Sequence, residues 1–443
     1  MTSPTSPQMN PTASSPAVDQ SPPDEEVLAK QATLTASLTA ADRAAFLERM
    51  HRHCGEAWFR WADQPVLFPP RLTRDLLGAS EMVIAHIVQQ RRATPPDLSK
   101  VPEDWRSPVD DLPHIILADF AVQPDHSVRL VEVQSVPAHF IQNLHHGESW
   151  VAVAMSVLGR TEATRLHWTI TGMDGAAYLE FVRACITGGH APDVCAMVDV
   201  RLAHQHILTE FRATQRTLGI PIVDAHTITQ DADGRLYRPD GAGGRLPIRR
   251  MYNRMLFDEV RLGPPLPFSL RRAREAGVEI WPPPADQFLV NKGMMTGMAM
   301  PSVPKTIPLD RVPADILAGD LTGYVLKRVE GFGGNAVHLD VTPDVVQRIP
   351  ATERSHWILQ QRFTYGMWVP VPTGYTTPSD DDQRLTNVGT EVRCIWARRA
   401  GDHTLTPLSF WVRTSRGPLF NAGSNRTSHG AGFTMGLFVE RTA

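Results

Sequence analysis

The clearest chemical signal in the sequence is a lysine followed by a glycine-rich loop, in the segment YVLKRVEGFGGNAVHLD. An apolar stretch ends in Lys327, and Gly331, Gly333 and Gly334 follow it. Glycines let backbone N–H groups approach phosphate oxygens without a Cβ atom in the way, and the lysine ammonium supplies positive charge. We therefore predict a phosphate-binding loop, with a tight hairpin beside a surface lysine as the alternative.

Two well-known phosphate motifs are not favoured by this loop. GFGGNA fits the dinucleotide pattern if Ala336 takes the last place, but that pattern requires a helix after the loop, and VHLD predicts a strand. An NAD-dependent oxidoreductase is therefore only a third hypothesis. A Walker loop is excluded because no Gly-Lys-Ser/Thr follows.

A second signal is an acidic pair on two neighbouring strands, HIILADFAV and SVRLVEVQSV, which flank a short turn. If Asp125 and His126 are the centre of that turn, the numbers of paired residues sum to 251. Asp119 then lies directly opposite Glu132, and Gln134, two residues along, shares the same face.

Two carboxylates on adjacent apolar strands require a cation between them, because unpaired charges are costly to bury. Carboxylate and amide oxygens are hard donors, which suit a Mg²⁺ ion that keeps some of its waters and bridges nucleotide phosphates. We therefore predict a magnesium site at Asp119, Glu132 and Gln134. The alternative is a solvated sheet face that carries ordinary charges.

Several arginines are candidates for stabilising the charge of a transferring phosphate group. Arg254 is the last residue of the segment IRRMYNR, Arg393 lies in EVRCIW, and Arg413 lies in WVRTSRG. For each of them, a structural or surface ion pair is the alternative.

Composition excludes some classes of partner. The chain has 443 residues, with 44 basic and 47 acidic side chains and a net charge of −3, so it offers no basic surface for nucleic acid or a membrane. Four scattered cysteines suggest neither disulfides nor a zinc site, and the N-terminus resembles no signal peptide, so we expect a cytoplasmic protein. Nothing in the sequence indicates its oligomeric state.

The hydrophobic pattern predicts an α/β protein. Helical periodicity covers residues 25–61 and 74–92, and residues 193–226 predict strand, helix and strand, which is typical of a parallel crossover. IRRMYNRML predicts another strand, FLVNKGMMTGM the start of a helix, and the chain beyond about residue 304 short strands.

Taken together, the two chemical segments resemble the ATP-grasp superfamily, and their order resembles its circularly permuted, glutathionylspermidine synthase-like branch. In that branch the acidic strand followed by Glu-x-Asn comes early, as ADFAVQPDHSVRLVEVQSVP does here, and the lysine and glycine flap come late, as in VLKRVEGFGGNAV. IRRMYNR, FLVNKGMMTGM and HWILQQRF resemble the family's cleft strand, Asn-Lys helix start and hinge strand.

The resemblance implies ATP-grasp-like mixed sheets around a central open α/β domain, with an N-terminal helical lobe. The segments expected are a disordered tail (1–24), the helical lobe (25–110), the metal-binding hairpin (111–165), the central α/β domain (166–300), and the flap with the C-terminal sheet (301–443).

The resemblance also implies ATP and Mg²⁺ as cofactors. Lys292 and Lys327 would contact the phosphates beneath the flap glycines, and Gln360, Gln361 and Phe363 would border the base. The magnesium set departs from the family at Gln134, where Asn is usual.

The activity implied is ligation of a small-molecule or peptide carboxylate to an amine or thiol through an acyl phosphate. The alternative is a non-catalytic relative that binds nucleotide or peptide as a regulatory module, and Gln134 is its best support.

Overall fold

The computed structural model describes residues 24–159, 164–331, 336–372, 385–417, 420 and 431–441. Over these ranges the chain forms several β-sheets with helices packed around them, which confirms the predicted α/β class. The predicted tail lies outside the described residues except for Asp24, where the first helix begins. Within the described ranges no helix has both the length and the apolar character that crossing a bilayer requires.

The largest sheet has eight strands in the order β1-β19-β18-β17-β2-β3, with β16 paired to β17 and β4 paired to β19. Its strands are β1 (Val66–Leu67), β2 (Ile115–Val122), β3 (Val128–Gln134), β4 (Thr164–His167), β16 (Met367–Pro372), β17 (Leu385–Ala397), β18 (Thr406–Ser415) and β19 (Gly432–Arg441). The early hairpin β2–β3 therefore lies beside β17, from near the end of the chain.

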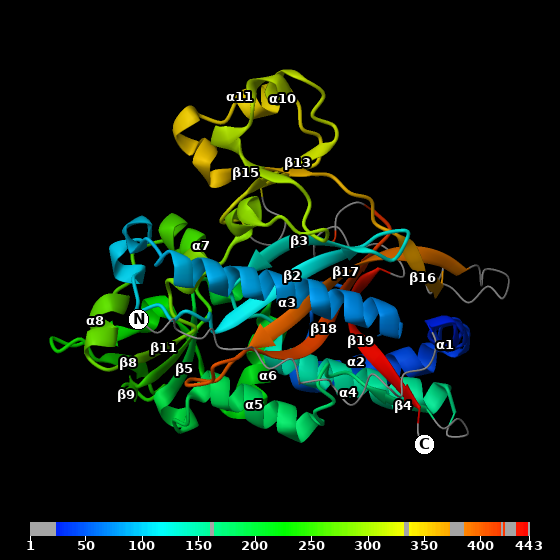
Figure 1. Ribbon diagram of the computed structural model, residues 1–443. Helices are drawn as coiled ribbons and strands as arrows, with labels where there is room; N and C mark the ends of the chain where they lie inside the picture. The colour runs from blue at the N-terminus through cyan, green and yellow to red at the C-terminus, as the bar shows by residue number, and fades with distance from the viewer. Residues whose placement is uncertain are drawn as a thin grey trace, which may run out of the picture.

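Strand β2 is buried along its whole length because helices cover both faces of this sheet. Alternate residues point to opposite faces: Ile116 and Ala118 join the core beneath helix α3 (Pro70–Ala93), which crosses the sheet in Figure 1, and Leu117 joins the core on the other side. Covering both faces explains the continuous apolar run of β2, in which Asp119 is the one charged residue.

The predicted N-terminal helices are present. They are α1 (Asp24–Ser37), α2 (Ala40–Cys54) and α3. Helix α2 begins with a capping box, in which the Thr39 side chain and Asp42 each satisfy the other's backbone N–H. Helices α1 and α2 pack against β1, β16 and α4 (Phe140–Val157); the domain boundaries given above stay a prediction.

A second sheet is parallel and has the order β11-β10-β5-β6. Its strands are β5 (Cys195–Asp199), β6 (Ile222–Asp224), β10 (Arg250–Asn253) and β11 (Glu279–Trp281). Helix α6 (Leu208–Leu218) joins β5 to β6, so the predicted parallel crossover is confirmed. The predicted strand at IRRMYNRML is confirmed as β10, at the centre of this sheet.

Short elements surround the parallel sheet. They are α5 (Gly175–Thr187), α7 (Phe257–Leu262), α8 (Leu270–Glu275), α9 (Asp286–Leu289), and the three-stranded sheet of β7 (Thr229–Gln230), β8 (Leu236–Pro239) and β9 (Arg245–Ile248). FLVNKGMMTGM forms the end of α9 and a 3₁₀ helix, η7 (Lys292–Gly297), instead of the start of a longer helix. Two glycines in this stretch disfavour a regular α-helix.

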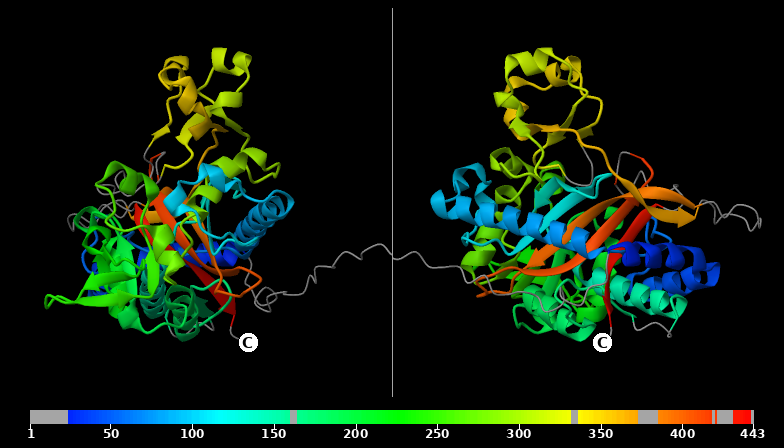
Figure 2. Two further views of the ribbon diagram at one scale, coloured as in Figure 1. Left: turned by 90° about the vertical axis from the view of Figure 1, so that its left-hand side faces the viewer. Right: turned by 45° about the vertical axis from the view of Figure 1, so that its right-hand side comes forward.

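A small antiparallel sheet, with the order β12-β15-β13-β14, stands above the main body on the side of β3 (Figures 1 and 2). Its elements are β12 (Thr306–Pro308), α10 (Ala314–Ala318), β13 (Tyr324–Arg328), β14 (Val337–His338), α11 (Pro343–Gln347) and β15 (Trp357–Gln361). It has an apolar core of its own. Helix η7 contacts β3, β12 and β15, so it links this sheet to the acidic hairpin.

Candidate functional site

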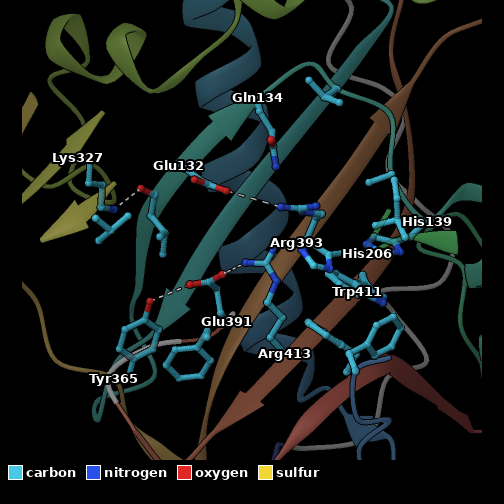
Figure 3. A pocket seen from close by; sticks show the side chains of 18 of the residues that line it. Glu132, Gln134, His139, His206, Lys327, Tyr365, Glu391, Arg393, Trp411 and Arg413 are labelled. Atoms are coloured by element: carbon cyan, nitrogen blue, oxygen red, sulfur yellow. Dashed lines mark hydrogen bonds and ion pairs between the residues drawn. The ribbon is translucent and has the colours of Figure 1, made fainter. Parts of the chain in front are cut away.

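A cavity of about 800 Å³ lies where the small sheet, the main sheet and the C-terminal edge of the parallel sheet meet. Its walls come from β3, β13, β15, β17 and β18 and from the segments after β5 and β10 (Figure 3). It brings together most of the residues predicted from the sequence, namely Glu132, Gln134, Arg254, Lys327, Gln360, Phe363, Arg393 and Arg413.

The acidic hairpin has the predicted pairing at its functional end. Asp119 lies directly opposite Glu132, as expected from the sum of 251. Nearer the turn the register shifts, so that Phe120 pairs with Leu130 and Val131 is an extra residue on β3. A bulge of this kind leaves one residue outside the ladder and re-aims its polar groups.

Two lysines from distant segments meet this bulged strand. The Lys327 ammonium, on β13, donates to the carbonyl of Val131 at 2.9 Å, across 196 residues of sequence. The Lys292 ammonium lies 3.2 Å from Glu132 and also donates to the carbonyl of Gly331. Burial lowers the pKa of Lys327 to about 8, although the charge of Glu132 opposes this shift. The glycine-loop segment and the acidic hairpin therefore converge on one cavity.

Asp119 is fully buried and does not line the cavity. Its carboxylate accepts from Arg393 Nε and Nη2, both at 2.6 Å, and from Arg413 Nη2 at 3.0 Å. Burial alone would raise the pKa of Asp119, but the two guanidinium charges outweigh it and lower the pKa to about 2. A metal ion could use this carboxylate only if a guanidinium released it.

The predicted magnesium set is thus divided between the core and the cavity wall. Glu132 and Gln134 line the cavity, whereas Asp119 lies beneath it. Across the described residues, no cluster of three or more histidine, cysteine, aspartate or glutamate side chains is placed to hold a metal ion. The predicted set, whose third member is an amide, stays a prediction.

The cross-strand register aligns charges in a row on the face opposite α3. Glu132 pairs with Asp119, Asp119 with Arg393, and Arg393 with Trp411. Directly paired residues on neighbouring strands share a face. The row therefore places two adjacent carboxylates beside one guanidinium, and it ends on an indole ring 5.7 Å from the Arg393 guanidinium carbon.

A neighbouring row contributes residues that were not predicted from the sequence. Glu391 pairs across the strands with Arg413, and their side chains form an ion pair. The Tyr365 hydroxyl donates to the other oxygen of Glu391 at 2.9 Å (Figure 3). Glu391 is two residues before Arg393, so alternation along the strand could have placed both residues on the same face. No comparable sequence signal indicated Tyr365.

The residues predicted to border a base lie on the small sheet and just after it. Gln360 is buried and faces the cavity, and its side-chain Oε1 has no hydrogen-bond partner in the described part of the chain. Phe363 also lines the cavity. Gln361 is exposed and absent from the cavity wall because neighbouring strand residues point to opposite faces. Only the backbone of Gln361 can contact a base bound in the cavity.

The predicted flap is described only in part. Gly331 is described, whereas Gly333 and Gly334 lie outside the described residues. Beyond the loop, Val337–His338 forms β14, which pairs with β13. The helix required by a dinucleotide motif is absent from this described segment, so that interpretation of GFGGNA is wrong.

His139 is a cavity residue that no sequence signal indicated. It precedes α4 with a left-handed backbone (φ 61°), and its ring stacks on Trp411 with centroids 3.8 Å apart. Burial, followed by the charges of Arg393, Arg254 and Arg413, holds the pKa of His139 well below its usual value. A neutral imidazole therefore lies near three guanidinium groups of the cavity.

Comparisons with known proteins do not identify a function for this cavity. No family model matches the sequence, and no curated protein shows a significant match. Among solved structures, the chain is similar to a glutathione synthetase-like effector (GSS30) from Globodera pallida in its apoform, with a TM-score of 0.48 and 12% sequence identity. The alignment covers 90% of this chain and 96% of that one. We draw no functional argument from a likeness this distant.

Proposed function

We propose that this protein is an ATP-dependent ligase of the ATP-grasp type, which joins a carboxylate to an amine or a thiol. The observation that carries the proposal is the contact of Lys327 with the bulged strand β3, one residue before Glu132. This contact joins the lysine and glycine segment of the small sheet to the acidic hairpin of the main sheet over one cavity. Binding a nucleotide between two sheets requires such a meeting of phosphate-binding and metal-binding groups.

In the proposed nucleotide site, Lys327 neutralises the phosphates from the cavity wall. Lys292 contacts Glu132 and is not part of that wall, so it would have to turn toward the phosphates to join Lys327. Gly331 belongs to the loop above the phosphates, and Gln360 and Phe363 border the base. Lys327 and Gln360 are both buried at the cavity wall, so contacts with them form away from bulk water, where charge interactions are stronger.

The cavity wall also offers oxygens for a metal ion. The Glu132 carboxylate and the Gln134 amide fit the preference of Mg²⁺ for hard oxygen donors, and Asp119 could join them only by giving up a guanidinium. When bound, Mg²⁺ would neutralise phosphate charge.

In the proposed reaction, a substrate carboxylate oxygen attacks the γ-phosphorus of ATP, and ADP leaves as the β–γ bridge breaks. An amine or thiol, which loses a proton, then attacks the acyl phosphate, and inorganic phosphate leaves as the amide or thioester forms. Arg393 and Arg413, which line the cavity, would offer charge to the transferring group. Enclosure in the cavity protects the acyl phosphate from water.

Binding of Mg-ATP to the purified protein, measured by calorimetry, tests the first step. Lys327→Ala should weaken binding by roughly 2–5 kcal/mol, because it removes a buried charge partner of the phosphates. The matched control is Lys305→Ala, which removes an exposed lysine of the same small sheet. The proposal fails if the wild-type protein does not bind Mg-ATP or if Lys327→Ala binds it equally well.

A second candidate function is nucleotide or peptide binding without turnover. It is favoured by the guanidiniums that hold both oxygens of Asp119, together with Gln134 in the place of the usual Asn. Phosphate release from ATP, measured across a panel of carboxylates and amines, separates the two candidates. Tight binding with no release for any pair would favour the non-catalytic module.

A further inference from the structure

The far end of the cavity lies at the C-terminal edge of the parallel sheet, away from the two lysines. Arg254 directly follows β10, and Asp199 is the last residue of β5. Both line the cavity, and so does Glu259 of α7. The carboxyl ends of parallel strands are a common place for ligands, because side chains from several strand ends meet there.

Arg254 is a buried cation, and two of its three guanidinium nitrogens have no hydrogen-bonding partner among the described residues. Its side chain is almost inaccessible (3% exposed), and neither Nε nor Nη1 has a partner among the described residues. Its guanidinium carbon lies 5.4 Å from the ring centre of Phe211 and 5.8 Å from that of Tyr252. The ring faces and the nearby charge of Glu210 offset part of the cost of burial, but they leave Nε and Nη1 without an acceptor.

Asp199 is a buried carboxylate with few hydrogen-bond donors around it. The hydrogen bond that it accepts comes from the backbone N–H of Val200 at 2.8 Å. Burial raises its pKa well above the usual value even though the charge of Arg254 opposes the shift, and Glu259 adds a like charge. Gln205 donates to Glu259 at 2.7 Å and fixes that second carboxylate at the wall.

We infer that this far end binds a zwitterion, such as an amino acid or a peptide terminus, with its carboxylate on Arg254 and its ammonium near Asp199 and Glu259. A phosphate or a dicarboxylate would satisfy Arg254 but would face two carboxylates. A simple amine would leave Nε and Nη1 of Arg254 without an acceptor. A ligand that carries both charges can pair with Arg254 and with the two carboxylates. Its assignment as one of the two ligase substrates rests on the proposed function.

Saturation-transfer NMR without nucleotide tests the site with a panel of free α-amino acids, 4-aminobutyrate and glycylglycine. Each has two singly charged analogues, an N-acetyl derivative and a carboxamide. At least one zwitterion should bind at millimolar concentration, and its two analogues should bind more weakly by roughly 30-fold or more, as expected when one partner of a buried charge pair is lost.

Two variants and one control locate the binding. Arg254→Met and Asp199→Asn should each weaken binding of the zwitterion by a similar factor. Arg249→Met, which removes an exposed arginine next to β10, should leave it unchanged. Urea unfolding shows whether each variant is folded, and Arg254→Lys, which keeps the charge but loses the planar fork, should also bind more weakly.

The inference is overturned if no zwitterion of the panel binds, if the singly charged analogues bind equally well, or if the Arg254 variants bind as the wild type does. The ligase proposal is tested separately by Mg-ATP binding. Lys327→Ala should leave zwitterion binding intact, so each proposal can fail without the other.

Discussion

The two ends of the cavity use the same kinds of charged side chains in different ways. At the lysine end the charges are matched, since Asp119 contacts two guanidiniums, Glu132 contacts Lys292 and Glu391 contacts Arg413. At the far end neither Arg254 nor Asp199 forms an ion pair within 4 Å among the described residues, although the Glu210 carboxylate is buried near Arg254. Antiparallel register places opposite charges face to face, whereas the ends of parallel strands gather side chains with no register to pair them. Paired charges on neighbouring strands stabilise the main sheet, whereas the charges at the far end are the ones that we infer bind a ligand.

The largest expected effect is on folding, from Asp119→Asn. The change removes the carboxylate charge that Arg393 and Arg413 share. Arg413 keeps Glu391, whereas the buried Arg393 keeps, of the carboxylates in the described chain, only the more distant Glu132, at 3.7 Å. We expect the free energy of unfolding in urea to fall by about 3–5 kcal/mol. The control is Glu132→Gln, whose partly exposed side chain should matter by less than about 1 kcal/mol. Equal losses for the two variants would contradict the division between core and cavity wall.

A smaller effect on folding is expected at the far end, from Glu210. Its carboxylate, buried beside Arg254, accepts from the N–H groups of Ile141 and Gln142 at the start of α4. Burial raises its pKa from 4.5 to about 6, against the opposing hydrogen bond from Gln142 and the charge of Arg254. A raised pKa in the folded state stabilises the fold below pH 4.5, and this contribution is lost as the pH rises through 6.

The wild type should therefore lose about 2 kcal/mol between pH 4.5 and 7, and Glu210→Gln should lack this loss. Urea unfolding at several pH values measures it. Glu81→Gln, at an exposed position of α3, should keep the wild-type pH dependence. Identical profiles for the wild type and Glu210→Gln would show that Glu210 does not titrate in this range.

A third prediction concerns the pH dependence of nucleotide binding at the lysine end. Because the pKa of Lys327 is about 8, its positive charge is present below that pH and is lost above it. The affinity for Mg-ATP should fall by up to about tenfold per pH unit above 8. Lys327→Arg, whose guanidinium stays charged, should show little change over the same range. A wild-type affinity independent of pH from 7 to 10 would remove Lys327 from the phosphate site.

The smallest effect is expected from Gln134→Asn, which shortens the side chain by one methylene and moves the amide oxygen at the cavity wall. The magnesium concentration needed for half-maximal ATP binding should change by roughly three- to tenfold. Calorimetric titrations at several magnesium concentrations measure it. No change would indicate that the amide does not contact the metal ion.

Much of the fold could be predicted from local patterns. The parallel crossover β5–α6–β6 follows from an amphipathic helix between two apolar strands. The opposition of Asp119 and Glu132 was predicted from a turn centred on Asp125 and His126, but the pairs next to the turn sum to 250, and the bulge at Val131 restores the sum of 251. The bulge at Val131 could not be foreseen, because nothing in VRLVEVQ marks which residue leaves the ladder. The glycines of η7 were a signal against the longer helix expected there.

The sequence by itself determined which residues carry charge and which neighbours they have along a strand, because period-two alternation and turn length act over a few residues. Only the tertiary structure decided that Lys327 meets β3, that Asp119 is enclosed while Glu132 faces the cavity, and that Arg254 stands apart with Asp199. These outcomes depend on the packing of β17 against β2 and of the small sheet above β3. Such contacts join segments hundreds of residues apart, and no local pattern encodes them.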